Sequence, residues 1–173
     1  MQVNVVLIGM PGAGKSTLGV LLAKALGMEF IDTDILIQKN EGRRLQEIID
    51  HYGIEYFLNT EERTILGLNA FNSVIATGGS VIYSEKAMVQ LREKGKVLYL
   101  HLPYHEIEKR LKNIKTRGIV MKKGSLREEY EERIPLYSKY SDLTINCENK
   151  DIEQCINDIV LLLAGKHTFG STL

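Results

Sequence analysis

Short runs of hydrophobic residues alternate along the chain with longer segments in which apolar residues recur every three or four positions. The short runs predict five strands, at Val3–Ile8, Glu29–Asp32, Ser73–Ala76, Lys96–His101 and Leu143–Asn146. The longer segments predict helices, at Lys15–Leu26, Asp34–Asn40, Leu45–His51, Ile54–Asn69, Ser84–Lys94, Tyr104–Asn113, Leu126–Tyr140 and Asp151–Ala164. Because strands and helices alternate, we expect a three-layer α/β/α fold around a central five-stranded parallel sheet.

Two stretches do not fit this simple alternation. The region between the second and third strands, about 33–70, is mainly helical and far longer than a crossover requires. The basic stretch Thr116–Ser125, within about 114–126, belongs to neither flanking helix. Because binding sites favour loops on a rigid scaffold, we interpret the first as a helical substrate-binding insertion and the second as a mobile lid. The length predicts that residues 1–173 form a single domain.

The segment GMPGAGKS, Gly9 to Ser16, matches the phosphate-loop pattern G-x-x-x-x-G-K-[ST] and lies directly between a predicted strand and a predicted helix. Glycines let backbone N–H groups turn toward a phosphate, and the helix N-terminus adds partial positive charge. We expect Lys15 to reach the β and γ phosphates, Ser16 to bind Mg²⁺, and Thr17 to cap the first helical turn. The nucleotide-binding residues predicted from this segment are Gly9, Gly12, Ala13, Gly14, Lys15, Ser16 and Thr17.

Two carboxylates lie at the end of the second predicted strand, in the sequence FIDTD. Asp32 is predicted to help hold Mg²⁺, and Asp34 to accept or orient the proton of an attacking hydroxyl. Their side chains would point the same way as strand residues only if the strand continued past Asp32. Asp34 could instead be the N-cap of the next helix. Beside the phosphate loop, the pair favours a small kinase that uses ATP and Mg²⁺.

These segments, with ATGGS at Ala76–Ser80 and ERIPLY at Glu132–Tyr137, resemble the shikimate kinase family over about Val3 to Ile159. The family consists of small phosphate-loop proteins related to nucleoside-monophosphate kinases. The resemblance implies transfer of the γ-phosphoryl group of ATP to an alcohol, with shikimate as the first candidate and shikimate 3-phosphate, an intermediate of aromatic amino acid biosynthesis, as product.

The resemblance also implies roles for individual residues. Asp34 would bind the substrate hydroxyls and act as the catalytic carboxylate, together with Lys15 and Arg117. Arg117 would neutralise the transferring phosphate from the lid, and Arg110 would stack on adenine. Gly78 and Gly79 would offer backbone amides to the substrate. Arg133 would pair with the substrate carboxylate, although an acid between Glu128 and Glu132 could pair with it instead.

Three departures from the family pattern lie on the substrate side. Leu58 stands where the family has an arginine that shares the substrate carboxylate and pairs with the glutamate at Glu61. Ser80 replaces a third glycine, and the lid reads RGIV where the family usually has RPLL. We therefore expect phosphoryl transfer with altered recognition of the acceptor. The candidates to replace the missing arginine are Asn59, Arg43, Arg44 and Arg63.

Other functions stay open at this stage. The acceptor could be another small hydroxylated compound, such as homoserine or gluconate, or the chain could be a nucleotide-binding regulatory module without turnover. The 22 Lys and Arg residues balance 22 Asp and Glu residues, so we expect no nucleic-acid or membrane partner. We expect an anionic hydroxy-acid substrate, a monomer, a cytoplasmic location, and reduced thiols at Cys147 and Cys155.

Overall fold

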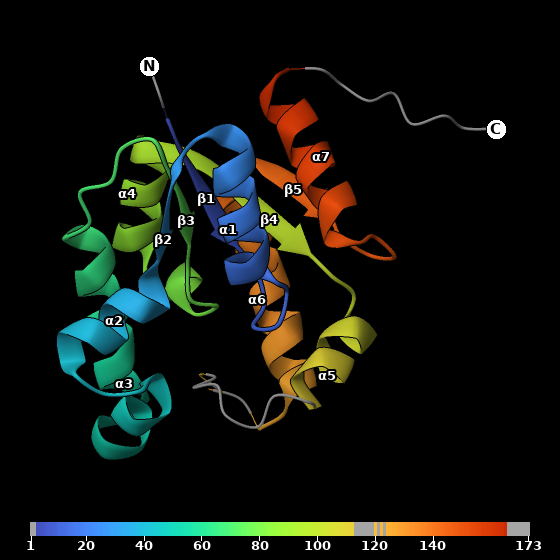
Figure 1. The fold of residues 1–173 in the computed structure, drawn as a ribbon. Helices are drawn as coiled ribbons and strands as arrows, with labels where there is room; N and C mark the ends of the chain where they lie inside the picture. The colour runs from blue at the N-terminus through green and yellow to red at the C-terminus, as the bar shows by residue number, and fades with distance from the viewer. Residues whose placement is uncertain (1–2, 113–119, 121, 123, 166–173) are drawn as a thin grey trace.

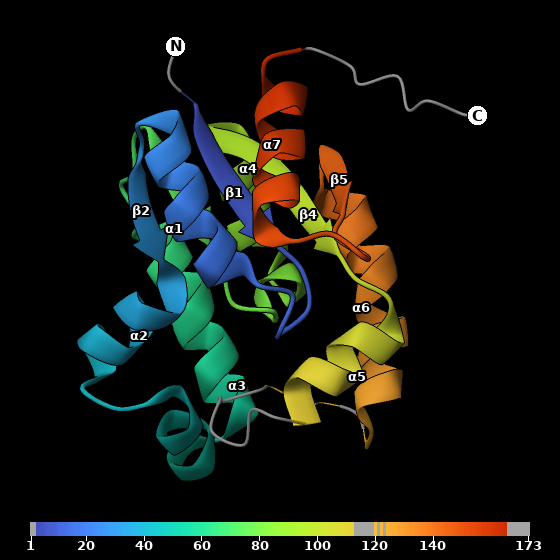
Figure 2. The same cartoon turned by 45° about the vertical axis from the view of Figure 1, so that its right-hand side comes forward.

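The computed structural model describes residues 3–112, 120, 122 and 124–165, and Figures 1 and 2 show it from two sides. The strands are β1 (Asn4–Ile8), β2 (Glu29–Asp32), β3 (Ser73–Ala76), β4 (Gly95–His101) and β5 (Leu143–Asn146). The helices are α1 (Lys15–Leu26), α2 (Thr33–Glu41), α3 (Leu45–Leu66), the 3₁₀ turn η1 (Val81–Tyr83), α4 (Glu85–Lys94), α5 (Tyr104–Lys112), α6 (Leu126–Tyr140) and α7 (Ile152–Leu163).

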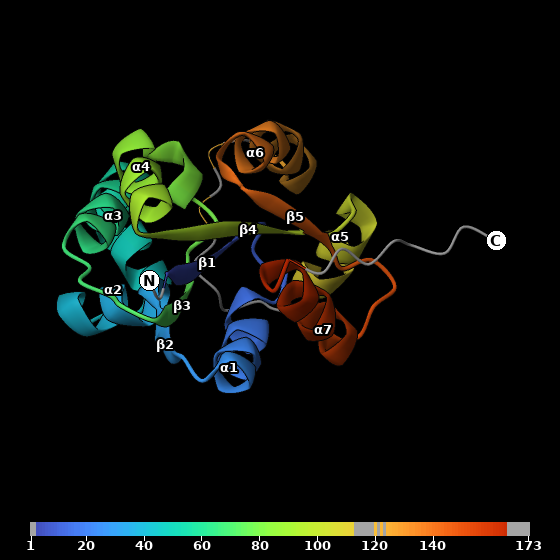
Figure 3. The same cartoon turned by 90° about the horizontal axis from the view of Figure 1, so that it is seen from above.

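The sheet is entirely parallel and its strands lie in the order β2-β3-β1-β4-β5. Helices α1 and α7 cover one face, and α4 and α6 cover the other (Figure 3). The central strand β1 is buried along its whole length, as expected for a parallel strand covered on both faces. These three layers confirm the predicted fold class. Within the described residues, no helix is both long enough and apolar enough to cross a bilayer.

The insertion between β2 and β3 is formed by α2 and α3. The two helices predicted on either side of Gly53 are both present within α3, separated by a kink where Gly53 has the non-helical values φ 82° and ψ 170°. A positive φ is easy for glycine, so the helical conformation is interrupted there and the chain changes direction. The insertion has a small apolar core of its own, formed by Ile37, Ile48, Phe57 and Val120. Because Val120 belongs to the predicted lid segment, this cluster connects the insertion to the lid.

The carboxyl ends of the strands meet at one edge of the sheet, the lower edge in Figure 2. The loop between β1 and α1 lies there, with α2 and α3 on one side and α5 on the other. In open parallel sheets this edge is where ligands bind. The fold therefore brings the phosphate loop and the insertion to the same place.

Of the two cysteines, Cys147 directly follows β5 and Cys155 lies in α7. Both are buried and carry free thiols, in agreement with the prediction. Burial, with a contribution from neighbouring Cys155, raises the pKa of the Cys147 thiol to about 12. Because the thiolate is the reactive form of cysteine, the raised pKa makes Cys147 a weak nucleophile at neutral pH.

Candidate active site

The phosphate loop has a backbone shape that requires glycine at three positions. Gly9, Gly12 and Gly14 have φ values of 145°, 81° and 97°, which other residues rarely adopt. A Cβ at Gly9 would also lie 2.7 Å from the carbonyl oxygen of Leu100 on the neighbouring strand. Lys15 is buried beneath this loop, where its Nζ donates hydrogen bonds to the carbonyl oxygens of Gly9 (2.7 Å) and Met10 (2.9 Å).

Helix α1 begins without a side-chain cap. Its N-cap is Gly14, and Thr17 is an exposed residue of the first turn, so the prediction that Thr17 caps the helix was wrong. The first amides of a helix have no partner within the helix, and those at the start of α1 face the site where a phosphate would bind. The amide of Ala13 differs, because it donates to the carbonyl oxygen of Met10 (3.1 Å).

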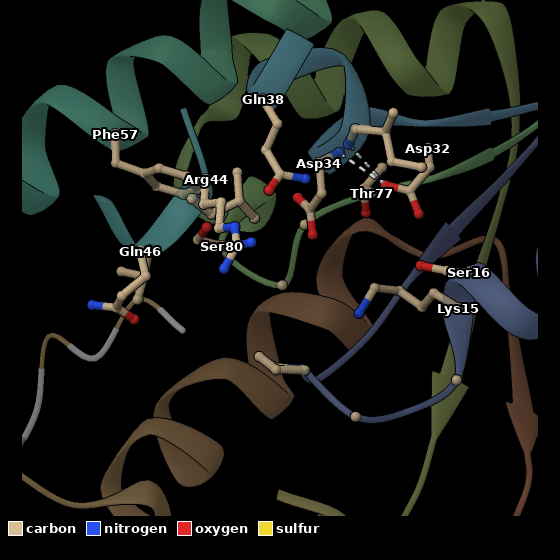
Figure 4. A pocket seen from close by; sticks show the side chains of 18 of the residues that line it. Lys15, Ser16, Asp32, Asp34, Gln38, Arg44, Gln46, Phe57, Thr77 and Ser80 are labelled. Atoms are coloured by element: carbon tan, nitrogen blue, oxygen red, sulfur yellow. Dashed lines mark hydrogen bonds between the residues drawn. The ribbon is translucent and has the colours of Figure 1, made fainter. Parts of the chain in front are cut away.

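The two carboxylates at the end of β2 have different local functions. Strand β2 ends at Asp32, whose Oδ1 accepts hydrogen bonds from the amides of Asp34 (2.9 Å) and Ile35 (3.3 Å). Asp32 is therefore the N-cap of α2, and the alternative that Asp34 caps this helix was wrong. The helix begins one residue earlier than predicted, and this turn, rather than strand alternation, brings Asp34 to the pocket (Figure 4).

A cavity of about 350 Å³ opens at the carboxyl edge of the sheet. This volume suits a small ligand or part of a nucleotide. Lys15 and Ser16 lie on one side, Arg44, Gln46 and Phe57 on the other, and Asp34 between them (Figure 4). The predicted site residues that line it are Gly12, Gly14, Lys15, Ser16, Asp32, Asp34, Gly78, Gly79 and Arg133.

The remaining predicted site residues lie elsewhere. Gly9, Ala13 and Thr17 belong to the loop or to α1 but do not line the cavity. Arg110 lies on α5 beside the phosphate loop, where its Nη1 donates to the carbonyl oxygen of Gly12 (3.3 Å), so adenine stacking stays a prediction. Arg117 lies outside the described residues.

The two oxygen ligands predicted for Mg²⁺, on Ser16 and Asp32, line the same cavity as Lys15. The described residues include no group of three His, Cys, Asp or Glu side chains that could hold a metal on their own. Magnesium bound to a nucleotide characteristically takes one or two protein oxygens and completes its octahedron with phosphates and water. The residues present therefore fit a Mg²⁺ that arrives with the nucleotide.

Arg133 is almost fully buried, with 1% exposure, although it borders the cavity. Its Nη2 lies 2.8 Å from Oε2 of Glu129 and also donates to the carbonyl oxygen of Val120, and its Nε donates to the hydroxyl of Tyr83 (3.2 Å). The structure therefore contains the predicted alternative, in which an acid of the same helix, Glu129, pairs with Arg133. These contacts fix the guanidinium rigidly, and its pairing with a substrate carboxylate stays a prediction.

Glu61 and Ser80 form a buried pair next to the cavity. Ser80 Oγ donates a 2.7 Å hydrogen bond to Oε2 of Glu61. A Cβ at Gly78 would lie 2.1 Å from Oε1 of Glu61 and 3.0 Å from Oδ1 of Asp34. Both carboxyl groups therefore lie next to Gly78, where only glycine leaves room for them. Leu58 instead packs against the apolar cluster of the insertion. Thus Ser80 hydrogen-bonds the glutamate that the sequence resemblance pairs with an arginine.

The pKa of Glu61 lies above 7, so its carboxyl group is mainly protonated at neutral pH. Burial raises its pKa to about 8, the hydrogen bond from Ser80 opposes this shift, and the nearby charge of Asp34 adds to it. The cations Lys15 and Arg133 also face Glu61 and lower its pKa. From the sequence, Glu61 was predicted only as the partner of an arginine. Nothing in the run TEERT distinguishes a buried glutamate from an exposed one.

Replacing Glu61 with glutamine is expected to stabilise the fold increasingly as pH rises. Between the unfolded pKa of 4.5 and the folded pKa of about 8, only the unfolded glutamate ionises, which favours unfolding of the natural protein. This cost grows by about 1.4 kcal/mol per pH unit and is constant above the folded pKa. Denaturant unfolding of both proteins from pH 5 to 9 measures the difference.

Glu62→Gln is the matched control, since Glu62 is the next residue of α3 and its side chain is 29% exposed. We expect no comparable rise for this variant. A stability difference between Glu61→Gln and the natural protein that stays flat from pH 5 to 8 would contradict a neutral Glu61.

A phosphate loop facing a carboxylate across a cavity, on a 2-3-1-4-5 parallel sheet, defines a phosphate-loop phosphotransferase. A family model described as "Shikimate kinase" matches residues 11–164, and the chain belongs to the shikimate kinase family. A shikimate kinase of Persephonella marina is 35% identical over 159 residues, covering 91% of this chain and 96% of that protein.

Solved structures show the same similarity. Shikimate kinase from Acinetobacter baumannii in complex with shikimate superposes with a TM-score of 0.85 at 28% identity, covering 95% of this chain and 94% of that one. Shikimate kinase from Aquifex aeolicus superposes with a TM-score of 0.82 at 31% identity, covering 94% and 96% of the two chains. The resemblance seen in the sequence motifs is confirmed over nearly the whole chain.

Proposed function

We propose that this protein transfers the γ-phosphoryl group of ATP to a hydroxyl of shikimate, giving shikimate 3-phosphate. The observation that carries the proposal is that the phosphate loop and Asp34 line the same cavity, in a chain of the shikimate kinase family. The related Acinetobacter baumannii enzyme was solved in complex with shikimate. The cytoplasmic location and the monomeric state remain predictions from the sequence.

The phosphate loop would bind the nucleotide. Lys15 would exchange its contacts with the loop carbonyls for the β and γ phosphates, keeping its charge within the loop. Ser16 and Asp32 would hold Mg²⁺, which would offset negative charge on the phosphates. Arg117 is proposed to add a further positive charge from the lid.

The acceptor would lie on the opposite side of the same cavity. Asp34 would orient the attacking hydroxyl and accept its proton. The amide of Gly78 donates to Thr33 Oγ1 (3.3 Å), so the amide of Gly79 is the better donor to the substrate. Tyr137 donates a 2.6 Å hydrogen bond to the carbonyl oxygen of Gly79, which holds the following peptide unit, between Gly79 and Ser80. Arg133 would face the acceptor carboxylate.

The purified protein is expected to release ADP from ATP and Mg²⁺ when shikimate is added, with a mass increase of one phosphoryl group on shikimate. A coupled ADP assay with shikimate, homoserine and gluconate in parallel measures this, and a reaction without acceptor gives the background. Turnover of another acceptor in preference to shikimate would replace the proposed substrate. ADP release at the background rate with all acceptors would favour a binding module without turnover.

A further inference from the structure

Three cationic side chains line the cavity within the described residues: Lys15, Arg44 and Arg133. Lys15 lies in the phosphate loop, and Arg133 is buried against Glu129. Arg44 differs from both, because it is exposed and its guanidinium has no ion pair or hydrogen bond with any residue in the described ranges. It lies across the cavity from the phosphate loop (Figure 4). A negatively charged group of a ligand can reach it there.

The position of Arg44 is unfavourable for the local structure. Arg44 is the N-cap of α3, a position that prefers Ser, Thr, Asp or Asn because their side chains accept hydrogen bonds from the first amides. An arginine side chain has no acceptor, and its charge lies at the positive end of the helix dipole. Only the reverse contact is made, from the Arg44 amide to Oε2 of Glu47 (2.8 Å). Residues that break local rules inside a cavity are characteristic of functional sites.

The other residues considered as replacements for the missing arginine have different surroundings. The guanidinium of Arg43 lies over the ring of Tyr52, 5.8 Å from its centroid. Arg63 donates to Thr60 Oγ1 (3.0 Å) and lies over another ring of α3. Neither of these, nor Asn59, lines the cavity. Arg44 alone among the four candidates does so.

We propose that Arg44 binds the carboxylate of the acceptor and thereby determines that this kinase accepts an anionic hydroxy acid. The inference rests on the proposed function and names a specificity residue for it. Gln38 and Gln46 line the same cavity and can donate amide hydrogen bonds beside the arginine. The positive charge that Arg44 adds at the acceptor end of the cavity then lies at the N-cap of α3. Leu58, farther along this helix, contributes only apolar packing.

Replacing Arg44 with serine tests this directly, because serine is a favoured N-cap. We expect KM for shikimate to rise roughly ten- to a hundredfold, the loss typical of a charge-assisted hydrogen bond. We expect kcat and KM for ATP to change less than twofold. Regaining the cap should raise Tm by about 2–4 °C, so weaker binding by a more stable protein cannot come from misfolding.

Arg43→Ser is the matched control, since Arg43 is the neighbouring residue of the same type and lies outside the cavity. Its KM for shikimate should stay within twofold of the natural protein. Shikimate methyl ester, which has no carboxylate charge, is the matched substrate. For the ester, Arg44→Ser and the natural protein should differ less than twofold, because the interaction with Arg44 is already absent.

Calorimetric titration with shikimate accompanies the kinetics, so that binding and turnover are separated. If the natural protein phosphorylates shikimate and Arg44→Ser raises neither KM nor Kd more than twofold, only the role of Arg44 is overturned. Equal weakening of acid and ester would also overturn it, since the effect would then be one of shape. A natural protein that binds shikimate without phosphorylating it would refute the proposed function alone, and one that does neither would refute both.

Discussion

Asp34→Asn is expected to lower kcat for shikimate phosphorylation by about 10²–10⁴-fold, the usual contribution of a general base. Asparagine keeps the size of the side chain and one acceptor oxygen, but it cannot take the proton of the attacking hydroxyl. The helix should be unaffected, because Asp32 rather than Asp34 caps α2. The loss should therefore appear in kcat, with smaller changes in KM and in Tm.

Steady-state kinetics with both substrates varied, together with thermal unfolding, measure this effect. Asp50→Asn is the control, since Asp50 is exposed on α3 and does not line the cavity. A kcat for Asp34→Asn within tenfold of the natural value would remove Asp34 from the catalytic residues.

Lys15→Met is expected to reduce kcat/KM for ATP by about 10²–10³-fold, comparable to removal of one preorganised donor from a transition-state site. Methionine has a similar length and fills the same space without the charge. The change also removes the hydrogen bonds from Nζ to the carbonyl oxygens of Gly9 and Met10, so some loss of stability is expected as well.

Thermal unfolding and ATP titration separate these two effects. Lys24→Met, in the last turn of the same helix and exposed, should leave both the kinetics and Tm close to those of the natural protein. Nearly normal turnover by Lys15→Met would show that the lysine only supports the loop.

The strand and helix positions could be predicted closely, because they depend on local patterns. All five predicted strands are present, and β2, β3 and β5 have the predicted bounds. The start of α2 was wrong by one residue, and the N-cap is Asp32 instead of Asp34, which was considered as an alternative cap. Helix propensity changes little from one residue to the next, whereas a cap depends on the geometry of a single turn.

The phosphate side of the site could be predicted more completely than the acceptor side. Lys15, Ser16 and the glycines of the loop belong to one short segment, so their relative positions follow from its single conformation. The acceptor side combines residues from α2, α3, α6 and the loop between β3 and η1. The burial and neutral state of Glu61 could not be read from the sequence, because they depend on Ser80, nineteen positions away, and on the cover of surrounding elements.

The sequence by itself determined the α/β class, the phosphate loop and the family, since each depends on residues that are close together or on motifs in a fixed order. It also located the difference from the family, at Leu58 and Ser80. Only the tertiary structure decided which of the candidates to replace the missing arginine lines the cavity. Arg43 and Arg44 are adjacent and chemically identical, yet one lies over Tyr52 and the other lines the cavity. The side chains of successive residues at the start of a helix point in different directions. The packing of α3 against α2 decides which of these side chains points toward the cavity.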